Sequence, residues 1–197
     1  MSPVNAPAPT IYLLVGYPGT GKYTVAQELA KQLDAAGRTT RVVDNHYVNN
    51  PVFGLVQQDG VGNLPEGIWD RVGEVRGALL ATIETLSPPG WSFVFTNWIG
   101  ENESGAKDYL ERLRAMAGAR ASEFVIVRLV CETAELTTRV ATPQRRERMK
   151  WTDAAAVLRL TETHRLIDPG PPAITIDNTR LTPAECAAAI LERAASR

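Results

Sequence analysis

A glycine-rich segment that carries one lysine is the part of this sequence best suited to chemistry. Glycines let the backbone curl so that successive N–H groups point at phosphate oxygens. The start of a following helix adds partial positive charge, and Lys22 adds a full one. The segment therefore predicts a loop that binds the phosphates of a nucleoside triphosphate. The residues expected to contact the nucleotide are Gly16, Pro18, Gly19, Thr20, Gly21, Lys22, Tyr23 and Thr24.

The elements on both sides of this segment can hold it in place. Residues 11–15 form an apolar run that predicts a strand, and residues 25–33 have helical spacing. A strand, a glycine turn and a helix in that order are the context that a phosphate-binding loop needs. A plain turn between strand and helix is the alternative, and it leaves the lysine unexplained.

One position departs from the usual loop pattern. Ser or Thr normally follows the lysine directly, and its hydroxyl contacts Mg²⁺. Here Tyr23 takes that position and Thr24 comes next. Tyrosine is too bulky to replace the hydroxyl simply. A chain of this fold that only binds its ligand, without chemistry, therefore stays open as a reading.

The remaining pattern alternates strands and helices. Such alternation predicts an α/β fold with a five-stranded parallel sheet and helices on both faces. We expect one domain over residues 10–197 and a loose tail over 1–9, which lacks the features of a signal peptide. The predicted strands cover 11–15, 39–43, 91–95, 124–130 and 173–176. The predicted helices cover 25–33, 67–86, 103–118, 133–140, 152 to about 167, and the segment after Thr182, while 47–65 reads as irregular.

Ligands of such sheets bind beyond the carboxyl ends of the strands, where two polar groups are expected. Asp44 follows the second strand and can orient Mg²⁺ through water or accept a proton from an attacking hydroxyl. A capping role is the alternative for this aspartate. His46 is a candidate substrate contact on the same turn. Asn97 follows the third strand and is a further candidate substrate contact. No acidic pair occurs there, which argues against motor-type ATPases.

Arginines supply the remaining candidates. The long helix over 67–86 carries Arg71 and Arg76 at opposite edges of its apolar stripe, and Arg71 is preferred as a substrate contact because it is nearer the irregular stretch. A basic segment follows the fourth strand, and guanidinium groups can stabilise charge on a transferring phosphoryl. A solvated face is the alternative reading. The arginines assigned to this catalytic role are Arg139, Arg145 and Arg146.

Composition narrows the partners. The chain has 197 residues, is 44% hydrophobic and carries a net charge of −1. A charge this close to zero gives no general reason to expect nucleic acid or an anionic membrane. No apolar run is long enough to cross a bilayer. The two cysteines, Cys131 and Cys186, match no metal-binding spacing and read as reduced thiols of a cytoplasmic protein.

The phosphate-binding loop, Asp44, the basic segment and the Ile176-Asp177-Asn178-Thr179 turn together resemble the P-loop small-molecule kinases. That group includes shikimate, gluconate and adenylate kinases and chloramphenicol phosphotransferase. The resemblance implies a P-loop NTPase fold, ATP and Mg²⁺ as cofactors, and an arginine-rich lid over about 139–151. It places Lys22 on the β- and γ-phosphates, Thr24 and Asp44 near the metal, and Asn178 near adenine.

The same resemblance leaves the acceptor open. The shikimate-type Asp-x-Asp is here Asp44-Asn45-His46, and the glycine-rich acceptor motif after the third strand is absent. We therefore expect a phosphotransferase that acts on a small molecule of unassigned identity, through a hydroxyl. The alternative is a nucleotide-binding ATPase or switch that acts on a protein partner. The sequence does not fix the oligomeric state.

Overall fold

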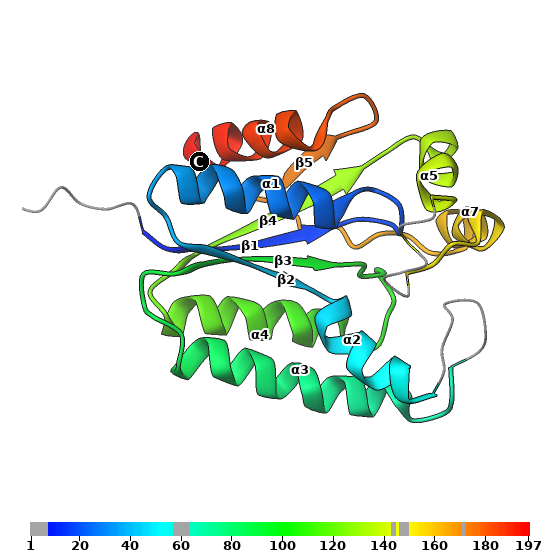
Figure 1. Cartoon of the computed structure of the whole chain (residues 1–197), viewed down its shortest axis with the longest axis horizontal. Helices are drawn as coiled ribbons and strands as arrows, with labels where there is room; N and C mark the ends of the chain where they lie inside the picture. Colours follow the sequence, from blue (N-terminus) through cyan, green and yellow to red (C-terminus); the bar gives the residue numbers. More distant parts are fainter. Residues whose placement is uncertain (1–7, 57–63, 143–144, 146–149, 171) are drawn as a thin grey trace, which may run out of the picture.

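A single parallel sheet organises the chain (Figure 1). The computed structural model describes residues 8–56, 64–142, 145, 150–170 and 172–197. The strands lie in the order β2-β3-β1-β4-β5, and every pair is parallel. Their bounds are β1 Thr10–Val15, β2 Thr40–Asp44, β3 Ser92–Asn97, β4 Glu123–Val130 and β5 Ile174–Asp177. The predicted fold class and the five predicted strands are thus confirmed.

The central strand shows how the two faces of the sheet are built. Side chains of β1 alternate between faces, as the period of two in a strand requires. Ile11, Leu13 and Val15 enter one hydrophobic cluster, while Tyr12 and Leu14 enter the other. All five are at most 2% exposed. Both faces are therefore dry, and polar groups meet solvent only where the strands end.

Helices cover both faces (Figure 1). On one face α1 packs against α8, and on the other α3 packs against α4, while α5 and α7 lie together beyond the carboxyl ends of the strands. A capping box between Thr182 and Glu185 starts α8, next to the predicted proline. The bounds are α1 Lys22–Ala35, α3 Ile68–Thr85, α4 Ala106–Ala119, α5 Thr133–Val140, α7 Ala154–Thr163 and α8 Pro183–Ala195.

The stretch after β2 corrects the sequence prediction. Residues 47–65 were expected to be irregular, but α2 covers His46–Phe53 and a 3₁₀ turn, η1, covers Gly54–Val56. The helix forms despite Pro51 within it. Val48 and Phe53 pack against two side chains of α3, Ile68 and Val72, and this burial outweighs the lost backbone hydrogen bond. Residues 57–63 lie outside the described part of the chain.

The end of α7 also differs from the prediction. The helix was expected to reach about residue 167, but it ends at Thr163, and His164 is extended. Long-range hydrogen bonds explain the early end. The Ile167 N–H donates to the Ile99 carbonyl at 2.9 Å, and the Leu166 N–H donates to the Tyr17 hydroxyl at 3.1 Å. The segment after α7 therefore runs beside the end of β3 and the phosphate-binding loop instead of continuing as a helix.

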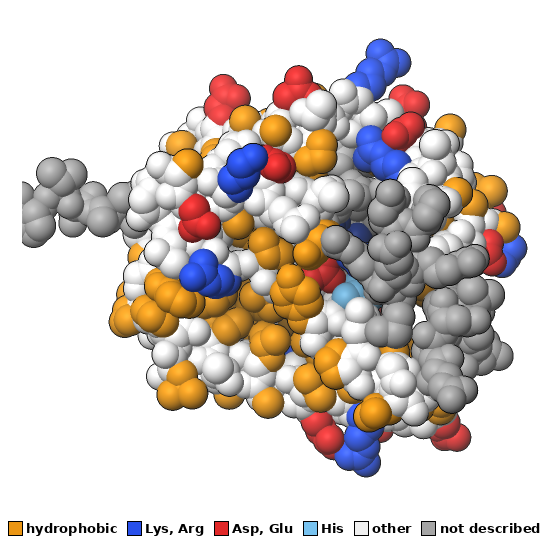
Figure 2. All heavy atoms as spheres, viewed as in Figure 1, with side chains coloured by type: hydrophobic (Ala, Val, Ile, Leu, Met, Phe, Trp, Pro, Cys, Tyr) orange, Lys and Arg blue, Asp and Glu red, His pale blue; other side chains and the backbone are white. Residues whose placement is uncertain are grey.

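Part of the surface is hydrophobic. On the face drawn in Figure 2, hydrophobic side chains gather over β2 between α1 and α3. Within the described residues, no helix is both long and apolar enough to span a membrane. Cys131 and Cys186 are unpaired, as the sequence analysis expected.

Candidate phosphoryl-transfer site

The predicted phosphate-binding loop, residues 16–24, needs glycine at defined points. Gly19 and Gly21 have φ values of +96° and +81°, which favour glycine. Gly16 is required for space, because a Cβ there would lie 2.7 Å from Thr20 Oγ1 and 2.9 Å from the Leu129 carbonyl oxygen. The backbone therefore curls tightly between the end of β1 and the start of α1, as the sequence pattern predicts.

This curl leaves main-chain donors unsatisfied. Within the described part of the chain, the N–H groups of Gly19, Gly21 and Lys22 have no hydrogen-bond acceptor. Gly21 and Lys22 lie at the N-terminus of α1, where the helix dipole adds positive potential, and Gly19 lies in the turn just before it. Unsatisfied donors at a helix N-terminus form a ready-made anion site.

Lys22 lies inside the same loop. Its Nζ donates to the carbonyl oxygens of Gly16 at 2.7 Å and Tyr17 at 2.9 Å. Burial, and then the positive charges of Lys150 and Arg145, lower the pKa of Lys22 to about 7, although the Asp44 carboxylate acts in the opposite direction. An anion bound beside these groups would favour the protonated form of Lys22.

Two threonines and Tyr23 hold the loop by contacts within it. Thr20 Oγ1 donates to the Tyr17 carbonyl at 2.9 Å, and Thr24 Oγ1 donates to the Gly21 carbonyl at 2.8 Å. The Tyr23 hydroxyl accepts from Gln27 Nε2 at 3.2 Å. Pro18, half-buried, has no N–H and adds no donor to the loop. These side chains therefore support the backbone of the loop.

Asn178 supports the loop from behind. Asn178 is 2% exposed, and its side-chain Nδ2 donates to the Thr20 carbonyl oxygen at 2.6 Å. The resemblance to P-loop kinases predicts that Asn178 lies near adenine, whereas its amide nitrogen donates to the loop backbone. The Tyr17 hydroxyl ties the opposite side of the loop to the end of α7 by donating to the His164 carbonyl at 2.7 Å.

Asp44 ends β2 and forms the second charged part of the site. It is 2% exposed and lies in register with Thr96 of β3. Its Oδ2 accepts from Lys150 Nζ at 3.0 Å, and its Oδ1 accepts from the His46 N–H at 2.8 Å. Burial alone would raise the pKa of Asp44, but Lys150 and the His46 amide bring it below its usual value. The carboxylate therefore stays ionised at neutral pH.

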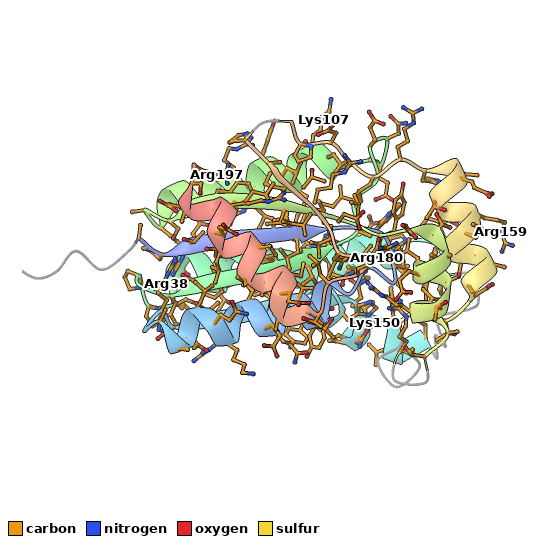
Figure 3. All side chains as sticks on the ribbon, turned by 90° about the horizontal axis from the view of Figure 1, so that it is seen from above. Arg38, Lys107, Lys150, Arg159, Arg180 and Arg197 are labelled. Carbon is orange, nitrogen blue, oxygen red and sulfur yellow. The ribbon has the colours of Figure 1, made fainter. Side chains whose placement is uncertain are left out.

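Lys150 comes from the basic segment that precedes α7. Its ammonium nitrogen lies 4.6 Å from the centroid of the Tyr23 ring, on the face of that ring. Figure 3 places it at the carboxyl end of the sheet, between the start of α1 and the α5–α7 pair. The structure thus brings together Asp44, the phosphate-binding loop and a lysine that the sequence analysis left unassigned.

A narrow cavity extends from Asp44 towards α3 and α4. Its lining includes Asp44, Asn97, Arg76 and Tyr109. The Arg76 guanidinium lies 5.2 Å from the centroid of the Tyr109 ring. Asp44, which was predicted to meet substrate, therefore shares one cavity with Asn97, and an arginine of α3 accompanies them.

The other two predicted substrate contacts, Arg71 and His46, do not line this cavity. Arg71 was preferred over Arg76, but its side chain is 69% exposed, pairs with Glu74 at 2.5 Å and does not line the cavity. His46 is half-buried beside Asp44, and its Nδ1 lies 3.0 Å from Asn50 Oδ1. Burial, and then the charge of Lys150, lowers the pKa of His46, so the ring is neutral at pH 7.

The predicted catalytic arginines that the structure describes have different surroundings. Arg139 Nε donates to Glu135 Oε1 at 2.8 Å, and its guanidinium also donates to the carbonyl oxygens of Asn178 and Thr179. It thus joins α5 to the turn after β5. Arg145 is half-buried, and its charge acts on both Lys22 and Asp44. Arg146 lies outside the described residues, as do 143–144 and 147–149 of the predicted lid over 139–151.

The residues present fit a polyphosphate better than a directly bound metal ion. Unsatisfied amides, Lys22 and Lys150 are all donors that suit phosphate oxygens. In contrast, both carboxylate oxygens of Asp44 are engaged, and the Thr24 hydroxyl is exposed and donates to Gly21. No group of three or more His, Cys, Asp or Glu that could hold a metal ion occurs among the described residues. Direct ligation by Asp44 would require Lys150 to leave its Oδ2.

Sequence reasoning missed Lys150 and Tyr109 and ranked Arg76 second. Lys150 was visible as part of a basic segment, but nothing in the spacing pairs it with Asp44, which is 106 residues away. Arg76 differs from Arg71 only in which edge of α3 it occupies, and the packing of α2 and α4 on that helix decides which edge faces the site.

Comparisons with known proteins establish the fold. No protein-family model matches the chain, and no curated protein sequence matches it. Among solved structures, a candidate kinase from Chloroflexus aurantiacus J-10-fl has a TM-score of 0.64 at 22% identity, covering 94% of this chain and 98% of that one. A gluconokinase from Sinorhizobium meliloti 1021 has a TM-score of 0.59 at 15% identity, covering 95% and 93%.

A third structure was solved with ligands. The APS kinase of Mycobacterium tuberculosis, in complex with AMPPNP and APS, has a TM-score of 0.57 at 16% identity, covering 96% of this chain and 99% of that one. The chain therefore has the fold of the P-loop small-molecule kinases, as its sequence pattern predicts. At these identities the likeness concerns the fold, and the function is argued from the site.

Proposed function

We propose that this protein is an ATP-dependent phosphotransferase that moves the γ-phosphoryl group of ATP to a hydroxyl of a small molecule. One observation carries the proposal: unsatisfied loop amides, the half-buried Lys22 and the ionised Asp44 all lie at the same end of the sheet. The first two suit a triphosphate, and the third suits an attacking hydroxyl. The shared fold with kinases supports the same reading.

Each residue has a distinct task in this proposal. The amides of Gly19, Gly21 and Lys22 hold phosphate oxygens, while the Lys22 ammonium leaves its two carbonyl partners to neutralise charge on the transferring group. Arg145 adds a second positive charge near Lys22. The Asp44 carboxylate orients the acceptor hydroxyl and accepts its hydrogen bond. Mg²⁺, bound to ATP through its phosphates and water, would neutralise further phosphate charge.

The acceptor hydroxyl would approach Asp44 at this cavity, whose volume of about 10 Å³ holds about one water molecule. Asn97 and Arg76 line the cavity and can donate hydrogen bonds, and Tyr109 gives it an aromatic wall. A larger acceptor therefore requires these side chains to move apart, and the groups that it would meet are mostly polar. We propose that the reaction takes place in the cytoplasm, where ATP is available, with no nucleic acid or membrane as a partner.

The rival function, an ATPase or switch acting on a protein, lacks support in the site. The strand next to β1 is β3, and its last residues are Thr96 and Asn97, neither of them an acid. Without a carboxylate there, the end of β3 offers nothing to activate water for hydrolysis. ATP hydrolysis measured with and without candidate acceptors separates the two functions, because hydrolysis that needs only a protein partner would favour the rival.

A phosphorylation screen tests the proposal. Purified protein is incubated with labelled ATP and sugars, nucleosides, shikimate-like acids, or aminoglycoside- or chloramphenicol-type antibiotics. We expect transfer to one class, lost in Lys22→Met and retained in Lys31→Met. Lys31 is a suitable control because it lies on the same helix, with its side chain 76% exposed. Transfer that survives in Lys22→Met would refute the proposal.

A further inference from the structure

Three side chains from distant parts of the sequence meet at the edge of the phosphate-binding loop. Lys150 Nζ lies 3.0 Å from Asp44 Oδ2 and 4.6 Å from the centroid of the Tyr23 ring. The Lys150 side chain is 14% exposed and that of Asp44 is 2% exposed. A lysine ammonium is rarely buried to this extent without a partner that requires it there.

The position of this ammonium group can be compared with that of the metal ion in the usual phosphate-binding loop pattern. In the usual pattern, a hydroxyl directly after the loop lysine and an acid from a neighbouring strand share one Mg²⁺ ion. In this chain the residue after the lysine is Tyr23, which presents the face of its ring. The acid is Asp44, and the cation held between ring and acid is the ammonium of Lys150. A cation over an aromatic face is itself a favourable contact.

The charges around this point favour an anionic ligand. The charges of Lys150 and Arg145 both disfavour protonation of Lys22. Among the residues that the structure describes, Asp44 is the one carboxylate that shifts the pKa of Lys22. Like charges brought together in a half-buried site repel, and binding a polyanion relieves that repulsion. Lys150 is close enough to Lys22 for its charge to disfavour protonation of the Lys22 amine.

We propose that Lys150 is a second phosphate-binding lysine, and that its ammonium group stands where other loops hold a protein-bound metal ion. This inference rests on the proposed function, since it assumes that the loop binds ATP. It goes beyond that function in one respect: triphosphate binding in this chain depends on Lys150 and does not require a divalent ion. Asp44 and the Tyr23 ring are the positioning residues that hold the ammonium beside the loop.

Isothermal titration calorimetry of the full chain tests this directly. ATP is titrated in EDTA and, separately, in MgCl₂, against wild type, Lys150→Met, Lys150→Arg and Lys107→Met. Lys107, an exposed residue of α4, is the control because it lies well away from Lys150 (Figure 3). We expect wild type to bind ATP in EDTA. Loss of a charge-assisted contact should weaken this binding by about 10- to 100-fold in Lys150→Met. The loss in MgCl₂ should be smaller, Lys150→Arg should retain most of the affinity, and Lys107→Met should match wild type.

Several results would overturn the inference. One is metal-free ATP binding in Lys150→Met that equals wild type, and another is wild-type binding that appears only with Mg²⁺. A wild type that binds ATP in neither buffer would instead refute the proposed function. If Lys150→Met does not fold, Asp44→Asn is compared with Asp44→Asn/Lys150→Met, which leaves no buried carboxylate unpaired. The same weakening in EDTA is expected there, and its absence would count against Lys150.

Discussion

The phosphate-binding loop and the Asp44–Lys150 pair hold charge in different ways. The loop relies on neighbours in sequence, whose backbone N–H groups converge because Gly19 and Gly21 adopt left-handed conformations. The pair relies on two side chains that are 106 residues apart and almost fully buried. A backbone site tolerates many side-chain changes, whereas a buried pair fails when either partner is lost. The difference identifies which substitutions should impair binding and which should impair folding.

The largest expected effect separates binding from folding in the loop. Lys22→Met removes the single full charge within the loop while keeping the length of the side chain. We expect ATP affinity to fall by about 100-fold or more, since hydrogen bonds to charged groups are each worth about 1.5–3 kcal/mol. Calorimetry measures the affinity, and circular dichroism should show an intact fold. Lys31→Met should behave as wild type, and equal losses in both variants would contradict the assignment.

The buried pair should show its coupling in a double-mutant cycle. Removing one partner leaves an uncompensated buried charge, so Asp44→Asn and Lys150→Met should each lower the free energy of unfolding by about 3 kcal/mol. The double variant should lose less than the sum of the two, with a coupling energy of about 1–3 kcal/mol. Urea denaturation measures all four proteins. Additive losses would mean that the two groups do not interact.

The glycines allow a test of loop geometry with a matched control. Gly19 and Gly37 have similar φ values, +96° and +78°, but only Gly19 lacks space for a Cβ, which would lie 2.8 Å from Val140 Cγ2. Gly37→Ala should cost about 1 kcal/mol for the left-handed backbone alone. Gly19→Ala should cost about 1–3 kcal/mol more, because the clash adds to that strain. Thermal unfolding compares them, and equal costs would show that the loop has room to adjust.

The pH dependence of stability reports on Lys22. Burial lowers the pKa of Lys22 from 10.5 in the unfolded chain to about 7 in the folded one. Between these values the unfolded state binds more protons, so the contribution of Lys22 to stability rises with pH. Relative to Lys22→Met, wild type should gain about 1–3 kcal/mol from pH 7 to pH 10. Denaturation at several pH values measures this, and parallel curves for the two proteins would contradict it.

The smallest effect concerns Arg139. Its contacts with Glu135 and with the carbonyl oxygens of Asn178 and Thr179 indicate that it braces the site. Arg139→Met should lower stability by about 1 kcal/mol, as expected for hydrogen bonds at a partly exposed site. ATP affinity should change by less than about threefold, which is well under 1 kcal/mol. A selective loss of affinity at unchanged stability would instead return Arg139 to the catalytic role that the sequence suggested.

Sequence patterns predicted the fold well because the signals were local. Apolar runs marked the five strands, and the glycines of the loop marked the turn between β1 and α1. The same reasoning missed α2, because its stability comes from packing Val48 and Phe53 on α3 and not from the helix propensity of the segment. It also extended α7 too far, because the hydrogen bond from Ile167 to Ile99 that ends the helical path is long-range.

In the candidate site, too, local patterns predicted some residues, while long-range packing placed the others. The loop residues and Asp44 were identifiable because each has a motif or follows a strand. Lys150 was not, since its partner Asp44 lies in another part of the chain. Arg71 was preferred over Arg76 because it is nearer the stretch expected to be irregular, and a helical wheel does not show which edge of the helix its neighbours cover. Contacts between distant segments are set by packing, and a single sequence carries little information about them.

A crystal structure of the protein with a non-hydrolysable ATP analogue would examine the proposed phosphate site at the level of atoms. We expect the triphosphate to accept from the amides of Gly19, Gly21 and Lys22, with the Lys22 and Lys150 ammonium groups turned towards its oxygens. A nucleotide bound elsewhere, with Lys22 still donating to the carbonyls of Gly16 and Tyr17, would contradict both the loop assignment and the kinase proposal.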